Sequence, residues 1–376
     1  MKKVKVIFAG GGTGGHLIPA LAIAEKLKSR LVPEYEPDFI FVGTRRGLEF
    51  RMKEKLGYPL VLINIRGMAR SLSPANLLVP FLLVGAVIKS LRLMHRFHPD
   101  IVIGTGGYVM GPVIMAAALL NRPRVIQEQN SYPGVTTRQL ASRVNRVFLG
   151  FGAAAEYLGR KSRTVETGNP IKEIIGRVSR EEGRNHFGYA SPDIKVILIL
   201  GGSQGASAIN RNILKNLQGL ADNYQIIWQT GERDYKEVAA HAGGKASGRS
   251  LFPFTDRIEM AYAAADMVIA RAGALTLAEI TAAGLPSILI PYPHAAGDHQ
   301  RKNAAVFKEC GAAVIFDDSE LDKMNLLGET VRLFEKGERD RMAQATARLR
   351  DKRSRSAADL IVDEIFQLIN IRRSTS

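Results

Sequence analysis

The chain has 376 residues, of which 46% are hydrophobic and 23% are charged, a composition typical of a globular protein with about two domains. Its single cysteine, Cys310, excludes a disulfide within the chain and fits a reducing cytosol. The formal net charge is +16, and residues 1–166 carry 24 Lys and Arg against 10 Asp and Glu, so nearly all of the surplus lies in the first half.

This basic first half implies an acidic partner, either anionic lipid headgroups or a polyanionic substrate. Nucleic acid is disfavoured, because the sequence contains no basic motif interleaved with aromatic residues and no zinc-finger spacing. We therefore expect no nucleic-acid partner.

The first half alternates apolar runs with helical patterns. VKVIFAG at 4–10 ends in glycines, and residues 16–30 have the apolar spacing of a helix. The initial apolar run is too short for a signal peptide, so we interpret it as the first strand. Further strands are predicted at 38–42, 60–63, 101–103, 124–126 and 147–149. This alternation predicts a doubly wound α/β domain with a parallel sheet.

Residues 74–97 contain an apolar stretch of a different kind. From 77 to 88 no residue is charged, and three basic residues follow within eight positions. A bilayer-spanning helix needs about 20 apolar residues, so this stretch is too short to cross one. We expect it to lie in the interface of an anionic membrane; a buried helix with a basic exposed end is the alternative. The expected membrane contacts are Leu77, Leu78, Phe81, Leu82, Lys89, Arg92 and Arg96.

The second half opens as the first does. KVILILGGSQGA at 195–206 predicts a strand that runs into glycines, and a helical pattern follows at 207–220. We therefore predict two similar domains, joined near the Gly-Asn-Pro turn at 167–172. The last amphipathic segment, at 356–370, could pack on either domain.

The stretch 266–303 predicts an anion site. Two apolar strand patterns, at 267–270 and 287–291, bracket a short helix, and Arg271 stands just before that helix. Unpaired backbone N–H groups and the helix dipole both favour negative charge at such a helix start.

Polar residues near this helix extend the predicted site. Glu279 lies one turn further along and could accept hydrogen bonds from two neighbouring hydroxyls, as on a ribose. His299 and Gln300 follow the next strand at the same edge of the sheet. The pattern predicts a pocket for a phosphorylated, hydroxyl-rich ligand such as a nucleotide-sugar.

The glycine-rich loop GGGTGGH at 10–16 lets backbone amides approach phosphate oxygens. Gly10, Gly12 and Gly15 satisfy a dinucleotide-binding spacing, yet the second strand ends without an acid to hold a ribose. Arg45 and Arg46 could instead hold a 2′-phosphate, so an NADP-dependent reductase stays an alternative.

Several polar residues lie where open α/β sheets bind ligands. His16 begins the helix after the first glycine loop and is either a general base or a structural histidine. Tyr108 lies in the glycine-rich GTGGYVMGP, and Glu128 and Asn130 end a strand, where they are either ligand contacts or turn residues.

The loop GGSQGA at 201–206 supplies Ser203 and Gln204 as a predicted pyrophosphate cradle, and Asn210 follows in the next helix. The chain has no D-x-D triplet and no His/Cys cluster with metal-ligand spacing. We therefore expect no metal or cofactor, and expect helix N-termini and Arg271 to stabilise the leaving-group charge.

The motifs GGGTGGH, GTGGYVMGP, QEQN, TGNP, GGSQGA and RAGALTLAE…AAGLPSILIPYPHAAGDHQRKNA occur in one order over nearly the whole chain. Together they closely resemble the MurG family, the bacterial transferases that add N-acetylglucosamine to lipid-linked muramoyl-pentapeptide. The resemblance implies a GT-B fold, an α/β fold with two Rossmann-like domains facing across a cleft. It implies an acceptor- and membrane-binding domain at 1–166, a UDP-N-acetylglucosamine-binding domain at 167–355, and a final helix at 356–376 that packs back on the first domain.

The resemblance also implies roles for individual residues. The catalytic base would be His16 or, less favoured, Glu128. The implied donor-binding residues are Thr13, Gly14, Gly15, Asn130, Lys172, Ser203, Gln204, Phe254, Thr255, Arg271, Ala274, Leu275, Thr276, Glu279, His299 and Gln300. The implied acceptor-binding residues are Gly12, Thr13, His16, Tyr108, Glu128, Asn130 and Asn210.

Two positions depart from the family pattern. Lys172 stands where an Arg is often found, which keeps the charge but loses the bidentate fork. His299 stands where relatives carry Gln, which leaves its individual role open.

These expectations combine into an inverting glycosyltransferase that moves N-acetylglucosamine from UDP-N-acetylglucosamine to undecaprenyl-pyrophosphoryl-muramoyl-pentapeptide, peripherally bound at the cytoplasmic face of the membrane. Besides the reductase, two alternatives stay open: a nucleotide-sugar epimerase of the same fold, and a catalytically silent scaffold docked on the membrane.

Overall fold

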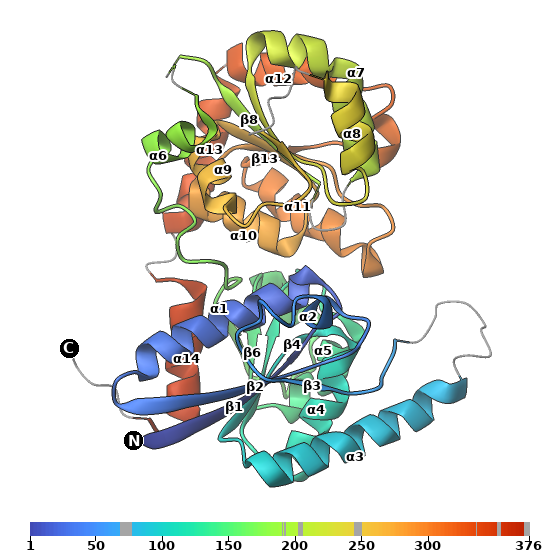
Figure 1. Cartoon of the computed structure of the whole chain (residues 1–376), viewed down its shortest axis with the longest axis vertical. Helices are drawn as coiled ribbons and strands as arrows, with labels where there is room; N and C mark the ends of the chain where they lie inside the picture. Colours follow the sequence, from blue (N-terminus) through green and yellow to red (C-terminus); the bar gives the residue numbers. More distant parts are fainter. Residues whose placement is uncertain are drawn as a thin grey trace. The chain divides into compact units, whose positions relative to one another are not determined.

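The computed structural model describes residues 1–67, 77–189, 191, 193–201, 206–243, 250–335, 337–351 and 355–371 (Figure 1). The chain divides into two compact units. Unit 1 comprises Met1–Ile171 and Arg355–Ser376, and unit 2 comprises Lys172–Ser354.

Unit 1 is built on a parallel sheet with the strand order β3-β2-β1-β4-β5-β6-β7 in the described residues. Its strands are β1 (Lys2–Gly10), β2 (Tyr35–Gly43), β3 (Leu60–Leu62), β4 (Ile101–Gly106), β5 (Arg124–Glu128), β6 (Arg146–Leu149) and β7 (Thr164–Glu166). Its helices are α1 (Gly14–Leu31), α2 (Leu48–Arg51), α3 (Val79–Phe97), α4 (Gly107–Leu119), α5 (Val135–Leu140), η2 (Ala141–Arg143), η3 (Gly152–Tyr157) and α14 (Ala357–Leu368).

The two faces of this sheet bury alternate residues of each strand, as the two-residue period of a strand requires. In β1, Val6 and Phe8 pack in the cluster that contains α1 and α14, whereas Ile7 and Ala9 pack in the cluster that contains α3 and α4. Figure 1 shows α1 and α14 on one side of the strands and α3 and α4 on the other. A strand buried on both faces explains the continuous apolar runs in the sequence.

The C-terminal helix α14 belongs to unit 1, because it packs against α1. Its apolar residues Ile361 and Phe366 are buried in the same cluster as the apolar residues of α1. Ion pairs add to this packing: Lys26 Nζ lies 3.3 Å from Asp359 Oδ1, and Arg30 Nη2 lies 3.3 Å from Asp363 Oδ1.

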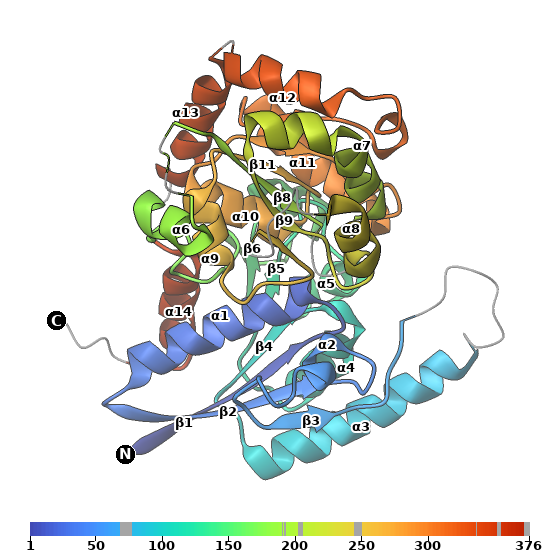
Figure 2. The ribbon, with the colours of Figure 1, turned by 45° about the horizontal axis from the view of Figure 1, so that its top comes forward.

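Unit 2 has a second parallel sheet, with the strand order β10-β9-β8-β11-β12-β13 in the described residues. Its strands are β8 (Val196–Leu200), β9 (Gln225–Gln229), β10 (Leu251–Phe252), β11 (Met267–Ala270), β12 (Ser287–Leu289) and β13 (Ala313–Ile315). Its helices are α6 (Arg180–Phe187), α7 (Ser207–Asn223), α8 (Tyr235–Ala242), α9 (Ile258–Ala264), α10 (Ala274–Ala283), η5 (Ala296–Asp298), α11 (His299–Glu309), η6 (Asp318–Glu320), α12 (Leu326–Glu335) and α13 (Glu338–Asp351). Figure 2 shows α7, α8 and α12 in this unit from a second angle.

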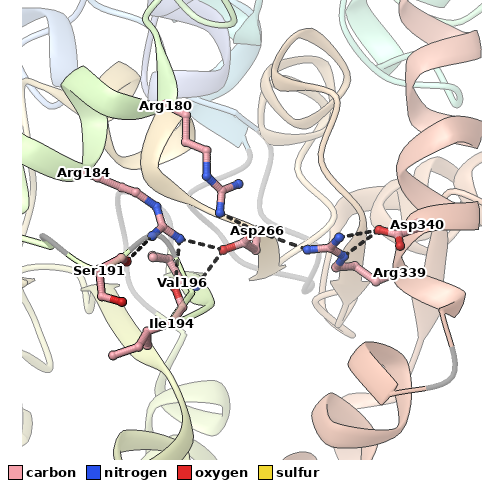
Figure 3. A network of polar contacts seen from close by, with 8 residues as sticks. All are labelled: Arg180, Arg184, Ser191, Ile194, Val196, Asp266, Arg339 and Asp340. Carbon is pink, nitrogen blue, oxygen red and sulfur yellow. Dashed lines mark hydrogen bonds and ion pairs between the residues drawn. The ribbon is translucent and has the colours of Figure 1, made fainter.

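A buried carboxylate at the start of β11 ties unit 2 together (Figure 3). Asp266 accepts hydrogen bonds from the backbone N–H of Val196 at 2.9 Å and from Arg180, Arg184 and Arg339 at 2.8, 3.2 and 3.2 Å. Three guanidinium groups and a strand amide compensate the cost of burying its charge. The network thereby fixes β11, the strand that leads to Arg271, against β8, α6 and α13.

The parallel α/β architecture predicted from the apolar runs is confirmed, and each strand predicted above overlaps an observed strand. No helix in the described part of the chain is both long and apolar enough to cross a membrane.

Candidate active-site residues of the two units

The strand order of unit 1 locates its ligand-binding edge. The chain runs from β1 to β2 and β3 on one side and returns to β4 on the other, so the topology switches between β1 and β4. Ligands of open α/β sheets bind beyond the carboxyl ends of the strands at such a point. The glycine loop after β1 and the glycine turn after β4 both lie there.

These glycines are required by close packing around His16. A Cβ atom on Gly106 would lie 2.4 Å from Cδ2 of His16, and one on Gly10 would lie 1.8 Å from Oγ1 of Thr105. Gly106 and Gly107 also have φ angles of 115° and 74°, which disfavour other residues. The glycines therefore let two strand ends meet around one histidine ring.

Hydrogen bonds orient that ring. His16 Nδ1 lies 3.1 Å from the carbonyl oxygen of Gly11 and 3.5 Å from Oγ1 of Thr13. Because a carbonyl oxygen can only accept, Nδ1 carries the proton in this contact, and in the neutral ring Nε2 then carries the lone pair. Thr105 Oγ1 donates to the His16 carbonyl at 2.8 Å, which anchors the start of α1. This tautomer is the one a general base needs.

A buried carboxylate lies beneath the glycine loop. Glu49 accepts hydrogen bonds from the backbone N–H groups of Gly12 and Thr44, each at 2.8 Å. Cβ atoms on Gly11, Gly43 or Gly47 would overlap its side chain, at 2.1 to 2.5 Å. The N–H of Gly12 is therefore committed to Glu49, which weakens the expectation that this loop cradles a phosphate. Glu49 was not among the residues predicted from the sequence, although its position shortly after the second predicted strand was a possible signal.

Glu128 and Asn130 lie together at the end of β5. Glu128 is buried, and its carboxylate accepts hydrogen bonds from the backbone N–H of Asn130 at 3.1 Å, from the Asn130 side chain at 3.3 Å and from Gly134 N–H at 3.1 Å. These contacts organise the loop that leads to α5. They favour a positioning role for Glu128 over that of a base.

A buried amide network supports the same edge. Gln129 Nε2 donates to the Thr105 carbonyl at 2.7 Å, and Asn169 Nδ2 donates to the Gln129 carbonyl at 2.9 Å. Gln127 Nε2 donates to Asn169 Oδ1 at 3.0 Å. The network links β4, β5 and the Gly-Asn-Pro turn. The sequence pattern did not indicate that these residues form a network. A possible signal was the presence of polar residues next to an apolar strand run.

The other predicted residues of unit 1 at this edge differ in exposure. Thr13 and Gly15 are exposed, Gly14 is buried, and Tyr108 is 38% exposed at the start of α4. The ring of Tyr108 lies beside the backbone of Gly67, where an added Cβ would be 3.3 Å from Cδ1.

In unit 2 the topology switches between β8 and β11, so the ends of these strands mark its ligand-binding edge. Arg271 follows β11 directly. Its Nη1 donates to the Ile290 carbonyl at 3.2 Å and forms an ion pair with Asp318, and its guanidinium carbon lies 5.5 Å from the ring centre of Tyr292. The side chain is held in place before any ligand arrives.

The helix α10 begins immediately afterwards. Gly273 is its N-cap residue and supplies no side-chain cap, and Ala274 begins the helix. The backbone N–H groups of Leu275 and Thr276, in the same first turn, have no acceptor within the helix. This is the helix start that the sequence predicted as an anion site.

Glu279 lies on α10 and is surrounded by other groups of the protein. Burial raises its pKa to about 7, opposed by the Tyr262 hydroxyl, which donates to Glu279 Oε2 at 2.9 Å, and by the charge of Lys172. Lys172 Nζ in turn donates to the Asp256 carbonyl at 3.0 Å. Glu279, Lys172 and the 254–256 loop are thus brought together, as a ribose and base site would require.

Four further predicted donor residues lie on loops and helix starts. Phe254 is 47% exposed, and the Thr255 N–H donates to Gln229 Oε1 at 3.2 Å. Gln300 Oε1 accepts from the Tyr292 N–H at 2.9 Å, which places it near Arg271. His299 begins α11 and contacts the Ala296 carbonyl through Nδ1 at 2.7 Å.

Asn210 lies apart from these residues. It is buried in unit 2, where its Nδ2 donates to the Thr230 carbonyl and to Asp234, and its Oδ1 accepts from Nε1 of Trp228. Both ends of the amide are used internally. This placement favours a structural role for Asn210, and its contact with the acceptor stays a prediction.

The predicted cradle residues Ser203 and Gln204 lie outside the described residues. Within the described ones, no group of three or more His, Cys, Asp and Glu side chains is placed to hold a metal ion.

Comparison with known proteins extends this picture. The model of the glycosyltransferase family 28 N-terminal domain matches residues 6–149, and that of the family 28 C-terminal domain matches residues 196–361. The two matches together span more than half of the chain.

Individual proteins match over the whole length. A protein from Chlorobaculum tepidum, named UDP-N-acetylglucosamine--N-acetylmuramyl-(pentapeptide) pyrophosphoryl-undecaprenol N-acetylglucosamine transferase, is 41% identical over 97% of this chain and 99% of its own. The crystal structure of Acinetobacter baumannii MurG is 30% identical, covers 98% of this chain and 100% of that chain, and aligns with a TM-score of 0.73. A UDP-N-acetylglucosamine 2-epimerase structure covers 100% of this chain and 99% of its own, with a TM-score of 0.61 at 16% identity, which shows the fold alone. The predicted GT-B fold class is confirmed.

Proposed function

The chain belongs to glycosyltransferase family 28, and we propose that it transfers N-acetylglucosamine from UDP-N-acetylglucosamine to undecaprenyl-pyrophosphoryl-muramoyl-pentapeptide. The observation that carries this proposal is the similarity to a transferase of that name over nearly the full length of both chains. The geometry of each unit supports it, since unit 1 holds an oriented histidine and unit 2 holds a helix start suited to an anion.

The proposed reaction follows from these groups. A sugar hydroxyl of the acceptor gives its proton to Nε2 of His16, and the hydroxyl oxygen attacks the anomeric carbon of the donor. The bond from that carbon to the UDP oxygen breaks, and its electron pair leaves with UDP. Attack opposite the leaving group inverts the anomeric centre and gives a β-1,4 linkage. The Gly11 carbonyl stabilises the imidazolium by accepting from Nδ1–H.

Unit 2 would stabilise the leaving group. Arg271 and the first turn of α10 would bind the diphosphate, a role supported by the Arg271 side chain and the Leu275 and Thr276 N–H groups, which follow the end of β11. Glu279 would accept the ribose hydroxyls, and the backbone at Phe254 and Thr255 would contact the base. Gln300 would meet the sugar hydroxyls from beside Tyr292.

The exposed face of α3 supports peripheral binding to an anionic membrane. Its buried residues are Ala86, Ser90 and Met94, on one side of the helix. Leu77 and Leu78 directly precede α3 and are 75% and 57% exposed, and Phe81, Val84 and Ile88 on the other side of the helix are 77%, 58% and 43% exposed. Lys89, Arg92 and Arg96 follow, and all three are exposed. Such an apolar stripe with adjacent cations suits a membrane interface, and we place the protein at the cytoplasmic face. Leu82 departs from this pattern, since it is only partly exposed.

The decisive experiment measures transfer of labelled N-acetylglucosamine from UDP-N-acetylglucosamine to the lipid-linked muramoyl-pentapeptide, with and without EDTA. We expect acceptor-dependent transfer that persists in EDTA. Binding of UDP-N-acetylglucosamine without transfer to this acceptor, or interconversion of the donor to its epimer, would refute the proposal.

A further inference from the structure

Unit 1 contains a hollow of about 640 Å³ between the ends of β2 and β3 and the start of α3. We call it the basic hollow. Its lining residues are Thr44, Arg45, Arg46, Leu62, Ile63, Asn64, Ile65, Arg66, Leu78, Leu82, Lys89 and Tyr108.

The charge of this lining has one sign. Four of the described residues that line it are cationic, and none is acidic. Arg45, Arg46 and Lys89 are exposed, and no ion pair within the described residues engages them. A concave surface with several cations and no carboxylate attracts a ligand with more than one negative charge. A diphosphate is the simplest such group.

One wall of the basic hollow is apolar. Leu78 is the N-cap residue of α3 and Leu82 follows four positions later in its first turn, so the two side chains lie on the same side of the helix start. Leu78 also belongs to the exposed stripe that we assign to the membrane interface, and Leu82 adjoins that stripe. A ligand in this hollow can therefore place its charge on the arginines and a hydrocarbon chain along α3. An inorganic anion would leave the apolar wall unused.

The hollow adjoins the proposed reaction centre. Tyr108 lines it and directly follows Gly107, which packs beside His16. On the other side, the N–H of Thr44 and the N–H of Gly12 share the carboxylate of Glu49. The hollow and the glycine loop are thus neighbours, joined through Glu49.

The glycine loop itself is a poorer phosphate site than the basic hollow. The N–H of Gly12 already donates to Glu49, and the buried carboxylate lies beneath the loop. A diphosphate on the loop would lose that donor and approach a negative charge. The arginines next to Thr44 offer opposite charge instead, with donors that a diphosphate can engage in pairs.

We propose that the basic hollow binds the diphosphate of the acceptor's polyprenyl carrier, with the first prenyl units against Leu78 and Leu82. This inference rests on the proposed function, because the carrier is part of the proposed acceptor. In this arrangement the diphosphate sits on Arg45, Arg46 and Lys89, and the attached sugar reaches His16 past Tyr108. The hollow thereby selects acceptors that carry a diphosphate and a prenyl chain.

Equilibrium binding of farnesyl diphosphate tests the site without any turnover. The variant is R45Q/R46Q, and the matched control is R51Q/K53Q, which removes the same charge from exposed positions a few residues further along. We expect R45Q/R46Q to bind farnesyl diphosphate at least roughly tenfold more weakly than the wild type, because charge-assisted hydrogen bonds are lost. Binding by the control should change little. The same binding measurement with Lys89→Gln, and with Arg92→Gln as its control, tests the contribution of α3. Farnesol should bind far more weakly than farnesyl diphosphate to the wild-type protein.

Two outcomes would overturn the proposal. Equal binding of farnesyl diphosphate by R45Q/R46Q and its control would show that the arginines do not form the site. A loss seen only with phosphatidylglycerol vesicles, and not with farnesyl diphosphate, would assign the arginines to bilayer headgroups. Thermal unfolding of each variant should match the wild type, because the altered side chains are exposed.

Kinetics separate this inference from the proposed function. If wild-type protein transfers the sugar, R45Q/R46Q should raise KM for the lipid-linked acceptor about tenfold or more and leave KM for UDP-N-acetylglucosamine unchanged. A normal KM for the acceptor in that variant would refute the proposed binding site in the basic hollow without contradicting the proposed function. If the wild-type protein transfers no sugar but binds farnesyl diphosphate through the arginines, the proposed function is refuted and the proposed binding site is retained.

Discussion

The carboxylate of Glu49 accepts a hydrogen bond from the backbone N–H of Gly12 at 2.8 Å, and thereby ties the turn after β2 to the glycine loop after β1. The same carboxylate accepts from the N–H of Thr44 at 2.8 Å. One buried acid thus sets the spacing between the loop that carries His16 and the turn that carries Arg45 and Arg46.

Glu49→Gln should therefore disturb the loop. Glutamine keeps one acceptor oxygen but sets an NH₂ group against a backbone donor, so one N–H loses its partner. We expect a loss of about 1–3 kcal/mol in stability and a lower kcat with little change in donor KM. Thermal unfolding and transfer kinetics check this, with the exposed Glu54→Gln as control. A variant with wild-type Tm and kcat would show that the loop does not depend on Glu49.

His16 and Glu128 can be distinguished as bases. His16→Ala removes the proposed base and should lower kcat by about 10²–10⁴ while the fold is retained. Glu128→Gln should act mainly on stability, because the Glu128 carboxylate organises the Asn130–Gly134 loop through three hydrogen bonds. Single-turnover rates and unfolding curves of both variants are the measurements. The reverse pattern, with Glu128→Gln abolishing chemistry in a stable protein, would make Glu128 the base.

Much of this arrangement was accessible from the sequence. The strand-glycine-helix units and the alternation of apolar runs follow from local periodicity, and they predicted both sheets. The glycine loop, Glu128 and Arg271 were identified because each lies at the carboxyl end of a predicted strand. The partners of these residues were not accessible, since Glu49–Gly12 and Arg271–Asp318 join positions far apart in the chain. The hydrogen bond from Trp228 Nε1 to Asn210 Oδ1 was not accessible either, and acceptor contact by Asn210 stays a prediction that the family resemblance implies.

The raised pKa of Glu279 predicts a pH dependence of folding. Its pKa is about 7 in the folded protein, chiefly because of burial, against 4.5 for an ordinary glutamate. Between pH 4.5 and 7 the unfolded chain releases a proton that the folded protein retains, so the free energy of unfolding of unit 2 falls as pH rises through this window. Glu279→Gln should flatten this part of the profile. Denaturant unfolding at pH 5, 6, 7 and 8 measures it, and an unchanged slope would contradict the assignment.

The same group predicts a pH dependence of donor binding. Only the ionised carboxylate of Glu279 accepts two ribose hydroxyls, so KM for UDP-N-acetylglucosamine should fall as pH rises through about 7. Tyr262→Phe removes a hydroxyl that stabilises the ionised form, and should move the transition to higher pH. Donor KM between pH 6 and 8.5 is the measurement. A transition that stays in place in both Tyr262→Phe and Glu279→Gln would belong to another group.

Arg271 is predicted to stabilise the departing diphosphate. Arg271→Ala should lower kcat by about 10²–10³, the usual cost of removing one such donor. The ion pair with Asp318 offers a structural alternative, which Asp318→Asn tests by removing the pair while keeping the guanidinium. We expect Asp318→Asn to retain most of the turnover. Equal losses in the two variants would mean that Arg271 acts only by fixing the loop that carries Asp318.

The exposed stripe of α3 predicts membrane affinity that can be separated from the basic hollow. Phe81→Ser/Val84→Ser removes two exposed apolar side chains that do not line the hollow, and should weaken binding to phosphatidylglycerol vesicles at least roughly tenfold. Val135→Ser, at a 60% exposed position outside α3, is the control. Binding should also weaken as salt screens Lys89, Arg92 and Arg96. Vesicle cosedimentation at low and high salt measures both effects.

Farnesyl diphosphate is proposed to occupy the basic hollow, so its binding should be retained in Phe81→Ser/Val84→Ser. If this variant loses binding to vesicles and to farnesyl diphosphate alike, the stripe and the hollow act as one binding surface.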